Sequence, residues 1–500
     1  MDTVVVETSL GRIRGRVDRG VRAFLGVPYA ASTAGAARFR PPRPHAAWAG
    51  VRDALAFGPA CPQPPLREAF GARPETFAML PLFGIPTSVE NQGEHCLVLN
   101  IWAMAGPNVQ APVLVWLHGG TDFGAADWPR FDGSSLAGQG DLVVVTVNYR
   151  LGVFGCLDLS WTGSPEYAHS GHVGILDLSC ALQWLRHNVS AFGGDPGNIT
   201  VVGGSRGASR LATLLLTTAP RPPFQRAVMA SPPPPRRACR HSPEDAARAV
   251  LRRLGVSARR PHAIAGTSVR RLLDAQAMVA AELGYRFQPV LDGVPVERRA
   301  YAEVAAGIAP GIPLLIGSTL NETSRTLGAD EADWAAMNDA ELAARCSRIA
   351  RRDVAALVEE HRRARPHDSA RKIAVAVTTD AMYRFPALAL ASARSAAATA
   401  PVYAYVFCGG TGSHSEDVLY FFANLRCAAL TSTSRASATL AEQASSAWTS
   451  FCHRGHPVVP SVRAWPAYDD RTRNTLLFGN PTRVVANPFA ARRALWEQTG

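Results

Sequence analysis

A serine set between glycines is the first feature whose residue types indicate chemistry. The stretch 203–207 reads Gly-Gly-Ser-Arg-Gly around Ser205; it follows the apolar run Ile199–Val202 and precedes a helical pattern over Ala208–Thr217. A sharp strand-to-helix turn needs glycines, because side chains would clash there, and it exposes the serine hydroxyl. The N-terminus of the following helix favours negative charge beside it. In this context the motif predicts a nucleophilic serine, whereas by itself the pattern is weak and occurs by chance.

A nucleophilic serine needs a base, and the base needs an acid that orients it. Glu322 comes shortly after the apolar run Pro313–Ile316, and His414 follows the run Val402–Phe407 through a glycine-rich loop. Serine, acid and then histidine is one of the chain orders in which such triads occur. The pattern alone leaves an alternative for each residue, because Glu322 could be a solvated loop carboxylate and His414 an ordinary loop histidine.

The elements that must position these residues are short apolar runs rich in β-branched side chains. Such runs are typical of strands buried on both faces. Helical patterns such as Leu176–Asn188 and Ala246–Leu254 lie between them, which predicts a mostly parallel sheet covered by helices on both faces. Sheets of this kind place their chemistry at the carboxyl ends of the strands. The predicted strands are Val113–Leu117, Leu142–Val147, Ile199–Val202, Ala227–Ala230, Pro313–Ile316 and Val402–Phe407.

The composition excludes several other classes of protein. The chain of 500 residues is 47% hydrophobic and carries a net charge of +12. The positive charge is almost entirely arginine, with Lys372 as the only lysine, and no basic run interleaves with aromatic residues, so we do not expect nucleic-acid binding. Nine cysteines show no zinc-binding spacing, and we predict no metal or cofactor.

Size and hydropathy suggest how the chain is organised. We expect residues 1–500 to form one α/β domain, since such folds often run large as a single unit. No apolar run reaches the roughly 18 residues of a membrane span. The N-terminus lacks a basic segment followed by an apolar one, so we expect no secretory signal and, by default, a cytoplasmic location. The oligomeric state is not predicted.

Further motifs run in order along nearly the whole chain. They are Gly11–Gly15, Phe24–Ala30, Arg38–Pro42, Glu94–Trp102, Val147–Gly152, Gly174–Pro196, Trp465–Tyr468 and Leu495–Trp496. Together they resemble the type-B carboxylesterase and cholinesterase family of α/β-hydrolases. The resemblance implies an α/β-hydrolase fold and the hydrolysis of a small-molecule carboxylic ester through an acyl-serine intermediate.

The same resemblance assigns roles to the three candidate residues. The family's Gly-Glu-Ser-Ala-Gly falls on 203–207, which makes Ser205 the nucleophile. Its Asp-Glu-Gly falls on 321–323 and makes Glu322 the triad acid, and its His-Gly-x-Asp/Glu falls on 414–417 and makes His414 the base.

The chain departs from the family pattern around the oxyanion hole. The resemblance implies that the backbone N–H groups of Gly120, Thr121 and Arg206 form this hole. The family's Gly-Gly-Gly-Phe loop here reads Gly-Gly-Thr-Asp over 119–122. Thr121 would be costly if its backbone needed a glycine-like conformation. Asp122 replaces an aromatic residue, unless a one-residue shift lets Phe123 take that place.

Two charged residues stand at positions expected to be neighbours. Asp122 and Arg206 both replace uncharged family residues, and one hypothesis is that they pair beside Ser205. We favour the alternative of two independent surface changes, because exposed ion pairs contribute little. Gly204 replaces the family's glutamate, a position at which other α/β-hydrolases vary.

Other matched residues imply structural roles. Cys61 and Cys96 match a pair that forms a disulfide in many relatives, although the missing signal argues against an oxidising compartment. Ion pairs are implied between Arg38 and Glu94 and between Arg150 and Asp177. No tryptophan lies between the two cysteines, which argues against choline esters; Phe70, Phe77 and Phe83 are expected to pack instead.

Three functions remain in competition. An active carboxylesterase is favoured, since Ser205, Glu322 and His414 are all present. A catalytically silent relative that uses the fold for binding or adhesion is the alternative, because the oxyanion loop is altered. A polyanion-binding protein rests on net charge alone.

Overall fold

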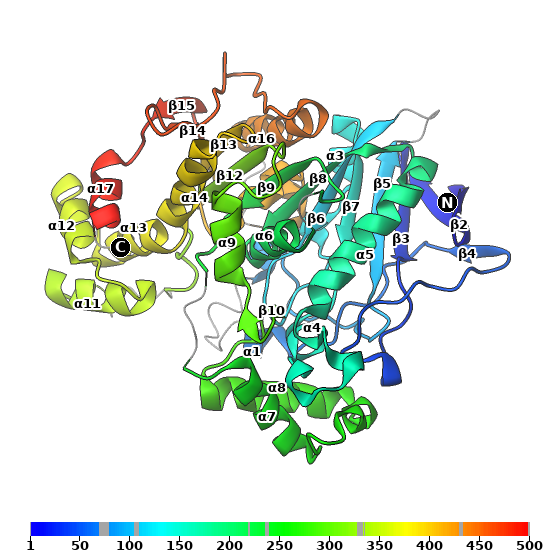
Figure 1. Cartoon of the computed structure of the whole chain (residues 1–500). Coiled ribbons are helices and arrows are strands. Elements are labelled where there is room, and N and C mark those ends of the chain that lie inside the picture. The colour runs from blue at the N-terminus through cyan, green and yellow to red at the C-terminus, as the bar shows by residue number, and fades with distance from the viewer. Residues whose placement is uncertain are drawn as a thin grey trace.

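A long, mostly parallel sheet forms the centre of the molecule (Figure 1). The computed structural model describes residues 2–69, 80–104, 110–218, 221–235, 240–327, 334, 336–429 and 434–498. The sheet order is β1-β2-β3-β5-β7-β6-β8-β9-β12-β13-β14-β15, with β4 beside β2. The bounds are β1 Asp2–Thr8, β2 Gly11–Asp18, β3 Val21–Pro28, β4 Val51–Asp53, β5 Val98–Met104, β6 Ala111–Leu117, β7 Val143–Val147, β8 Gly194–Gly204, β9 Arg226–Ala230, β12 Leu314–Thr319, β13 Val402–Phe407, β14 Asn474–Phe478 and β15 Arg483–Ala486; β10 (Val290–Leu291) and β11 (Val294–Pro295) form a separate pair.

Strand direction divides the sheet into two parts. From β7 through β6, β8, β9, β12 and β13 to β14, neighbouring strands pair in parallel. The strands before β7 pair antiparallel, apart from β4 with β2, and β15 pairs antiparallel with β14. All six predicted runs lie in the parallel part, so the predicted fold class is confirmed. The antiparallel N-terminal strands were not predicted.

Helices cover both faces of the sheet (Figure 1). One face packs against α5, α6 and α14, and the other against α3 and α16. The helices are α1 Leu66–Ala69, α3 Ser134–Gly140, α4 Gly152–Cys156, α5 Val173–Asn188, α6 Arg206–Thr218, α7 Pro243–Leu254, α8 Val269–Leu283, α9 Glu297–Ala305, α11 Asp339–Ala350, α12 Ala355–Ala364, α13 Ala370–Thr379, α14 Phe385–Ala396, α15 Asp417–Phe421, α16 Arg435–Arg454 and α17 Ala490–Gln498.

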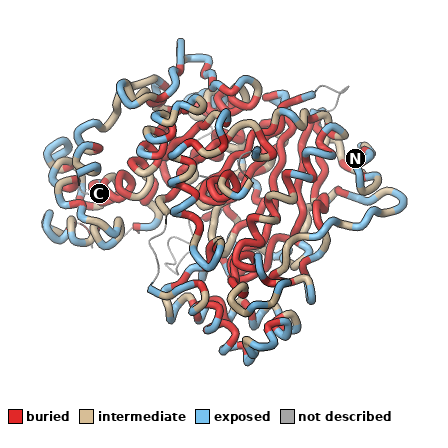
Figure 2. Tube along the Cα trace, viewed as in Figure 1, coloured by how far each residue is buried: buried red, intermediate tan, exposed pale blue. Residues whose placement is uncertain are grey.

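The core has two layers because side chains alternate along each strand. In β6, Val113 and Val115 enter the cluster beneath α5 and α6, while Leu114 and Trp116 enter the cluster beneath α16. Figure 2 shows buried residues concentrated along the central strands, with exposed ones gathered on outer helices such as α7 and α12. A strand of a sheet covered on both faces must therefore be apolar at every position.

The parallel register brings the carboxyl ends of β8, β12 and β13 to the same end of the sheet. Gly203 of β8 pairs with Met229 of β9, and Ala230 of β9 pairs with Gly317 of β12. Thr319 of β12 pairs with Phe407 of β13. The loops that carry Ser205, Glu322 and His414 therefore all leave the sheet at the carboxyl ends of the parallel strands.

One helical stretch meets the length and composition of a membrane span. Ala370–Ala396 joins α13, a π-helical segment (Asp380–Arg384) and α14, and 72% of its most apolar window is buried inside the structure. Buried core helices satisfy the same criteria, so this stretch is weak evidence for a span.

Candidate active site

The turn at Ser205 is as tight as the glycine spacing predicts. Ser205 lies between β8 and α6 with φ of 52°, a strained value for a residue other than glycine. A Cβ on Gly203 would lie 2.5 Å from the carbonyl carbon of Gly207, and one on Gly207 would lie 2.2 Å from the Leu117 oxygen. The Ser205 N–H donates to the Ala230 oxygen at 2.8 Å, which ties the turn to β9. The backbone thus holds the Ser205 hydroxyl at the carboxyl end of β8.

Gly204 is required for a different reason. A Cβ at this position would lie 2.5 Å from the indole ring of Trp116. That ring is buried and packs against Phe131, Phe422 and Trp448. The side chain that relatives carry just before the serine therefore has no room here.

Ser205, His414 and Glu322 form a continuous chain of contacts. His414 Nε2 lies 2.8 Å from Ser205 Oγ, and His414 Nδ1 lies 2.5 Å from Glu322 Oε2. Glu322 is buried, and its other oxygen accepts the Thr319 N–H at 2.7 Å. The structure thus brings together three residues separated by up to 209 positions in the sequence.

The electrostatics select one tautomer of His414. Burial by itself raises the pKa of Glu322, but the charge and hydrogen bond of His414, together with hydrogen bonds from Ser231 and Thr319, lower it overall. Glu322 is therefore ionised at neutral pH and can only accept hydrogen bonds. Nδ1 of His414 must carry the proton, which leaves the Nε2 lone pair facing the serine hydroxyl.

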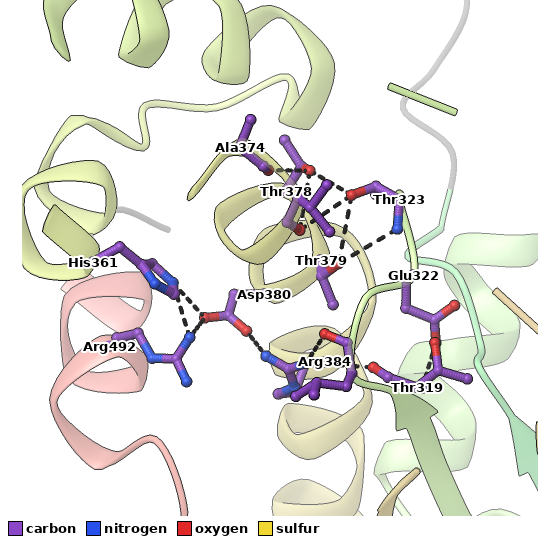
Figure 3. A network of polar contacts seen from close by, with 12 residues as sticks. Thr319, Glu322, Thr323, His361, Ala374, Thr378, Thr379, Asp380, Arg384 and Arg492 are labelled. Carbon is purple, nitrogen blue, oxygen red and sulfur yellow. Dashed lines mark hydrogen bonds and ion pairs between the residues drawn. The ribbon is translucent and has the colours of Figure 1, made fainter. Parts of the chain in front are cut away.

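A buried network of hydrogen bonds and ion pairs anchors the loop that carries Glu322 (Figure 3). Arg384 donates to the oxygen of Leu320 at 2.6 Å and forms an ion pair with Asp380. Asp380 also pairs with Arg492 of α17 at 2.8 Å. Asp380 and Arg384 are an acidic and a basic residue four positions apart in an otherwise apolar stretch, a signal that the sequence analysis did not use.

The oxyanion loop needs its glycine at 120 and not at 121. Gly120 has φ of 86°, and a Cβ there would lie 1.9 Å from the Phe123 oxygen. Thr121 is not among the residues with positive φ. The expected cost of a β-branched residue at this position therefore does not arise. A Cβ on Gly119 would lie 3.1 Å from Ser205 Cβ, so the loop passes directly beside the serine.

A small cavity of about 90 Å³ opens beside Ser205. Ser205, His414, Gly119 and Gly120 line it, together with aromatic side chains. Phe123 lines the cavity and Asp122 does not, as the one-residue shift predicts. An apolar wall beside a hydroxyl, an imidazole and a glycine loop suits an acyl group.

Comparisons with known proteins show the family of this chain. A model of the carboxylesterase family matches residues 2–496. The chain belongs to the carboxylesterase family.

Similar proteins include two esterases matched over most of their length. Para-nitrobenzyl esterase from Bacillus subtilis is 34% identical over 98% of this chain and 97% of that protein. Fumonisin B1 esterase from Sphingopyxis macrogoltabida is 30% identical over 94% of this chain and 85% of that protein. The crystal structure of a Geobacillus stearothermophilus carboxylesterase superposes with a TM-score of 0.83 at 33% identity, covering 98% of this chain and 99% of that one. Family and relatives together support ester hydrolysis by a serine carboxylesterase.

The hypothesis that Asp122 pairs with Arg206 in this carboxylesterase is wrong. Arg206 forms an ion pair at 2.5 Å with Glu297, the first residue of α9. Asp122 lies 3.8 Å from the exposed guanidinium of Arg286. Helices α6 and α9 pack together, and this places Glu297 within reach of the Arg206 side chain.

The carboxylesterase has a second arginine on α6 that the sequence analysis missed. Arg210 is buried and donates to the oxygens of Gly120 at 2.6 Å and Thr121 at 3.2 Å. Its guanidinium also lies over the Tyr149 ring, 5.1 Å from the centroid. In a trans peptide the N–H points opposite to the C=O, so Arg210 directs the N–H groups of Thr121 and Asp122 away from itself.

Replacing Arg210 with methionine is expected to lower kcat about 100-fold with little change in KM. The reason is that, in the role expected of this loop from the sequence, peptides free to rotate no longer aim their N–H groups at the developing oxyanion, and one such donor is typically worth about 10²–10³ in rate. Steady-state kinetics with p-nitrophenyl butyrate measure the effect, with Arg206→Met as the control from the same helix. Partial recovery in Arg210→Lys is expected. A rise in KM without a fall in kcat would contradict this positioning role.

Asp417 is a buried carboxyl close to the site. Burial, and secondarily the charge of Glu322, raises its pKa to about 7. Oδ2 accepts the Tyr405 hydroxyl at 2.9 Å, while Oδ1 is buried without a hydrogen-bond partner. Burial and the charge of Glu322 favour the neutral acid over the ion, and the hydrogen bond from Tyr405 opposes them in part.

The raised pKa of Asp417 predicts that the free energy of unfolding decreases as pH rises. Folding then favours protonated Asp417, so its stabilisation is complete below about pH 4 and is lost as pH rises toward about 7. Asp417→Asn keeps the acceptor for Tyr405 and removes the titration. From urea unfolding at pH 5 and pH 8, we expect the variant to gain about 2.5 kcal/mol relative to the wild type between these pH values. Parallel pH profiles of the two proteins would show that Asp417 is ionised when folded.

The expected structural pairs are present, with one difference. Arg38 with Glu94 and Arg150 with Asp177 form buried ion pairs at 2.5 and 2.6 Å. Cys61 and Cys96 are buried neighbours but free thiols, and the hydrogen bond that the Cys96 thiol donates to Cys61, followed by burial, raises the pKa of Cys96 well above its usual value.

The remaining sequence expectations concern metals and choline. Within the described ranges, no cluster of His, Cys, Asp or Glu could hold a metal. Phe83 is buried, and the Arg325 guanidinium already lies over its ring at 4.4 Å. Its ring thus packs within the protein, as expected, while Phe70 and Phe77 lie outside the described residues.

Proposed function

We propose that this carboxylesterase hydrolyses carboxylic esters through an acyl intermediate on Ser205. His414 acts as the general base and acid, and Glu322 orients the imidazole and stabilises its charged form. Backbone N–H groups of Gly120, Thr121 and Arg206 stabilise the oxyanion. The observation that carries the proposal is the unbroken contact from Ser205 Oγ through His414 to Glu322, at 2.8 and 2.5 Å.

The reaction follows from the atoms that face one another. Ser205 Oγ attacks the ester carbonyl carbon while its proton passes to His414 Nε2. The tetrahedral intermediate collapses, the bond to the alcohol oxygen breaks, and the alcohol leaves with the proton from Nε2. Water then gives its proton to Nε2 and attacks the acyl carbon, which releases the acid and returns the proton to Ser205.

The experiment combines covalent labelling with turnover. We expect a fluorophosphonate to label one residue, Ser205, as identified by mass spectrometry of the modified peptide, and we expect turnover of p-nitrophenyl butyrate to stop in proportion. Labelling without turnover would mean that the altered oxyanion loop does not support catalysis. Folded protein with neither labelling nor turnover would favour the silent, binding-type function.

A further inference from the structure

Two arginines line the cavity beside Ser205. Arg130 precedes Phe131 on the segment after the oxyanion loop, and Arg325 follows Glu322 by three residues. They come from distant parts of the chain and meet at one loop, where Arg130 donates to the oxygen of Ser415 and Arg325 donates to that of His414 at 2.5 Å. None of the described residues that line the same cavity is acidic. The described part of the wall is therefore apolar over most of its area and carries two positive charges.

Arg130 is a buried cation without an ion-pair partner among the described residues. Only 2% of Arg130 is exposed, and its Nε has no hydrogen-bond partner. A guanidinium has five N–H donors, and the bond to Ser415 satisfies one of them. Because a buried charge is costly unless it is paired, a site of this kind suits an anion that the described residues do not supply.

The acidic residues around Arg130 are either hydrogen-bonded to other groups or only partly ionised. Glu416 accepts hydrogen bonds from the N–H and hydroxyl groups of Thr411 and from the Ser413 N–H. Glu322 is held by His414, and Asp417, whose pKa burial raises to about 7, carries only part of a charge at neutral pH. Burial and the nearby charge of Arg325 lower the pKa of Arg130 to about 10, so it still carries its charge at neutral pH.

We propose that the cavity binds a carboxylate of the substrate, so that this carboxylesterase prefers esters with a second, anionic group close to the scissile bond. Arg130 holds that carboxylate, and Arg325 adds to the positive potential. The planar guanidinium fork matches a carboxylate in a way that a neutral acyl chain does not. The cavity is small, which favours a short chain between the carboxylate and the ester. This inference rests on the proposed function.

The test compares substrates of equal shape and different charge. Monomethyl succinate and methyl succinamate differ only by a carboxylate in place of an amide on the acyl side. Sodium 3-acetoxypropanoate and 3-acetoxypropanamide make the same comparison on the alcohol side. We expect kcat/KM for the anionic member of one pair to exceed that of its neutral partner by at least about tenfold. A preference in the first pair assigns the cavity to the acyl group, and one in the second assigns it to the alcohol.

Variants then connect the preference to Arg130. Arg130→Met is expected to reduce the ratio of anionic to neutral kcat/KM at least about tenfold, with partial recovery in Arg130→Lys. Arg270→Met is the matched control, because that side chain is 91% exposed, and it should keep the wild-type ratio. If Arg130→Met does not fold, the wild-type enzyme decides the question: succinate should protect Ser205 from a fluorophosphonate, whereas succinamide should not.

The outcomes separate this inference from the proposed function. Turnover of neutral esters with no anionic preference in either pair, or with no protection by succinate, would overturn the anionic site and leave the esterase proposal intact. Absence of both labelling and turnover with every ester would remove the proposed function itself.

Discussion

Replacing Ser205 with alanine is expected to lower kcat/KM for p-nitrophenyl butyrate by about 10⁶-fold, the loss seen when a triad nucleophile is removed. The alanine variant lacks the hydroxyl oxygen that lies 2.8 Å from His414 Nε2. Its backbone keeps the φ near 52° that the turn imposes, so the strain and the fold remain. Steady-state kinetics and fluorophosphonate labelling measure the effect, and thermal unfolding checks that the variant is native.

A neighbouring serine provides the control for this prediction. Ser209 lies one turn further along α6 and contacts the Tyr301 hydroxyl at 3.3 Å, away from His414. Ser209→Ala should keep both labelling and turnover. Activity of Ser205→Ala within tenfold of the wild type would mean that another residue is the nucleophile.

The second large effect is expected for Glu322→Gln, which should lower kcat about 10⁴-fold. An ionised Glu322 can only accept the Nδ1 proton, whereas a glutamine amide can donate to Nδ1 and stabilise the opposite tautomer. His414 would then present an N–H to Ser205 in place of a lone pair. Because Ser205 itself is retained, the residual rate should exceed that of Ser205→Ala, and slow labelling should remain.

The lowered pKa of Glu322 also gives this variant a pH signature. The ionised carboxylate stabilises the folded state above its unfolded pKa of about 4.3, and this stabilisation is lost as pH falls through the lower folded value. The stability difference between wild type and Glu322→Gln should therefore shrink in acid, as measured by urea unfolding at pH 7 and pH 3. Glu359→Gln, whose side chain is 76% exposed, is the control. A pH-independent difference would show that Glu322 is not the ionised partner of His414.

Local physics made much of this molecule predictable from sequence. A strand buried on both faces must be apolar at every position, which is why the run Val113–Leu117 and its counterparts identified the parallel sheet. Backbone atoms within 2.5 Å of where a Cβ would lie exclude side chains at Gly203 and Gly207, which is why the glycines around Ser205 identified the elbow. These requirements act between residues adjacent in the chain and therefore leave a signature there.

The tertiary structure alone decided which charged groups meet. Arg206 and Glu297 lie 91 residues apart, and only the packing of α6 on α9 brings them together. Arg130 and Arg325 reach the same loop from remote segments, 285 residues and 89 residues from their respective acceptors. Trp116, on another strand, is what leaves no room for a side chain at Gly204. Long flexible side chains choose their partners by the relative placement of whole helices and strands, and no periodicity or spacing along the chain records that placement.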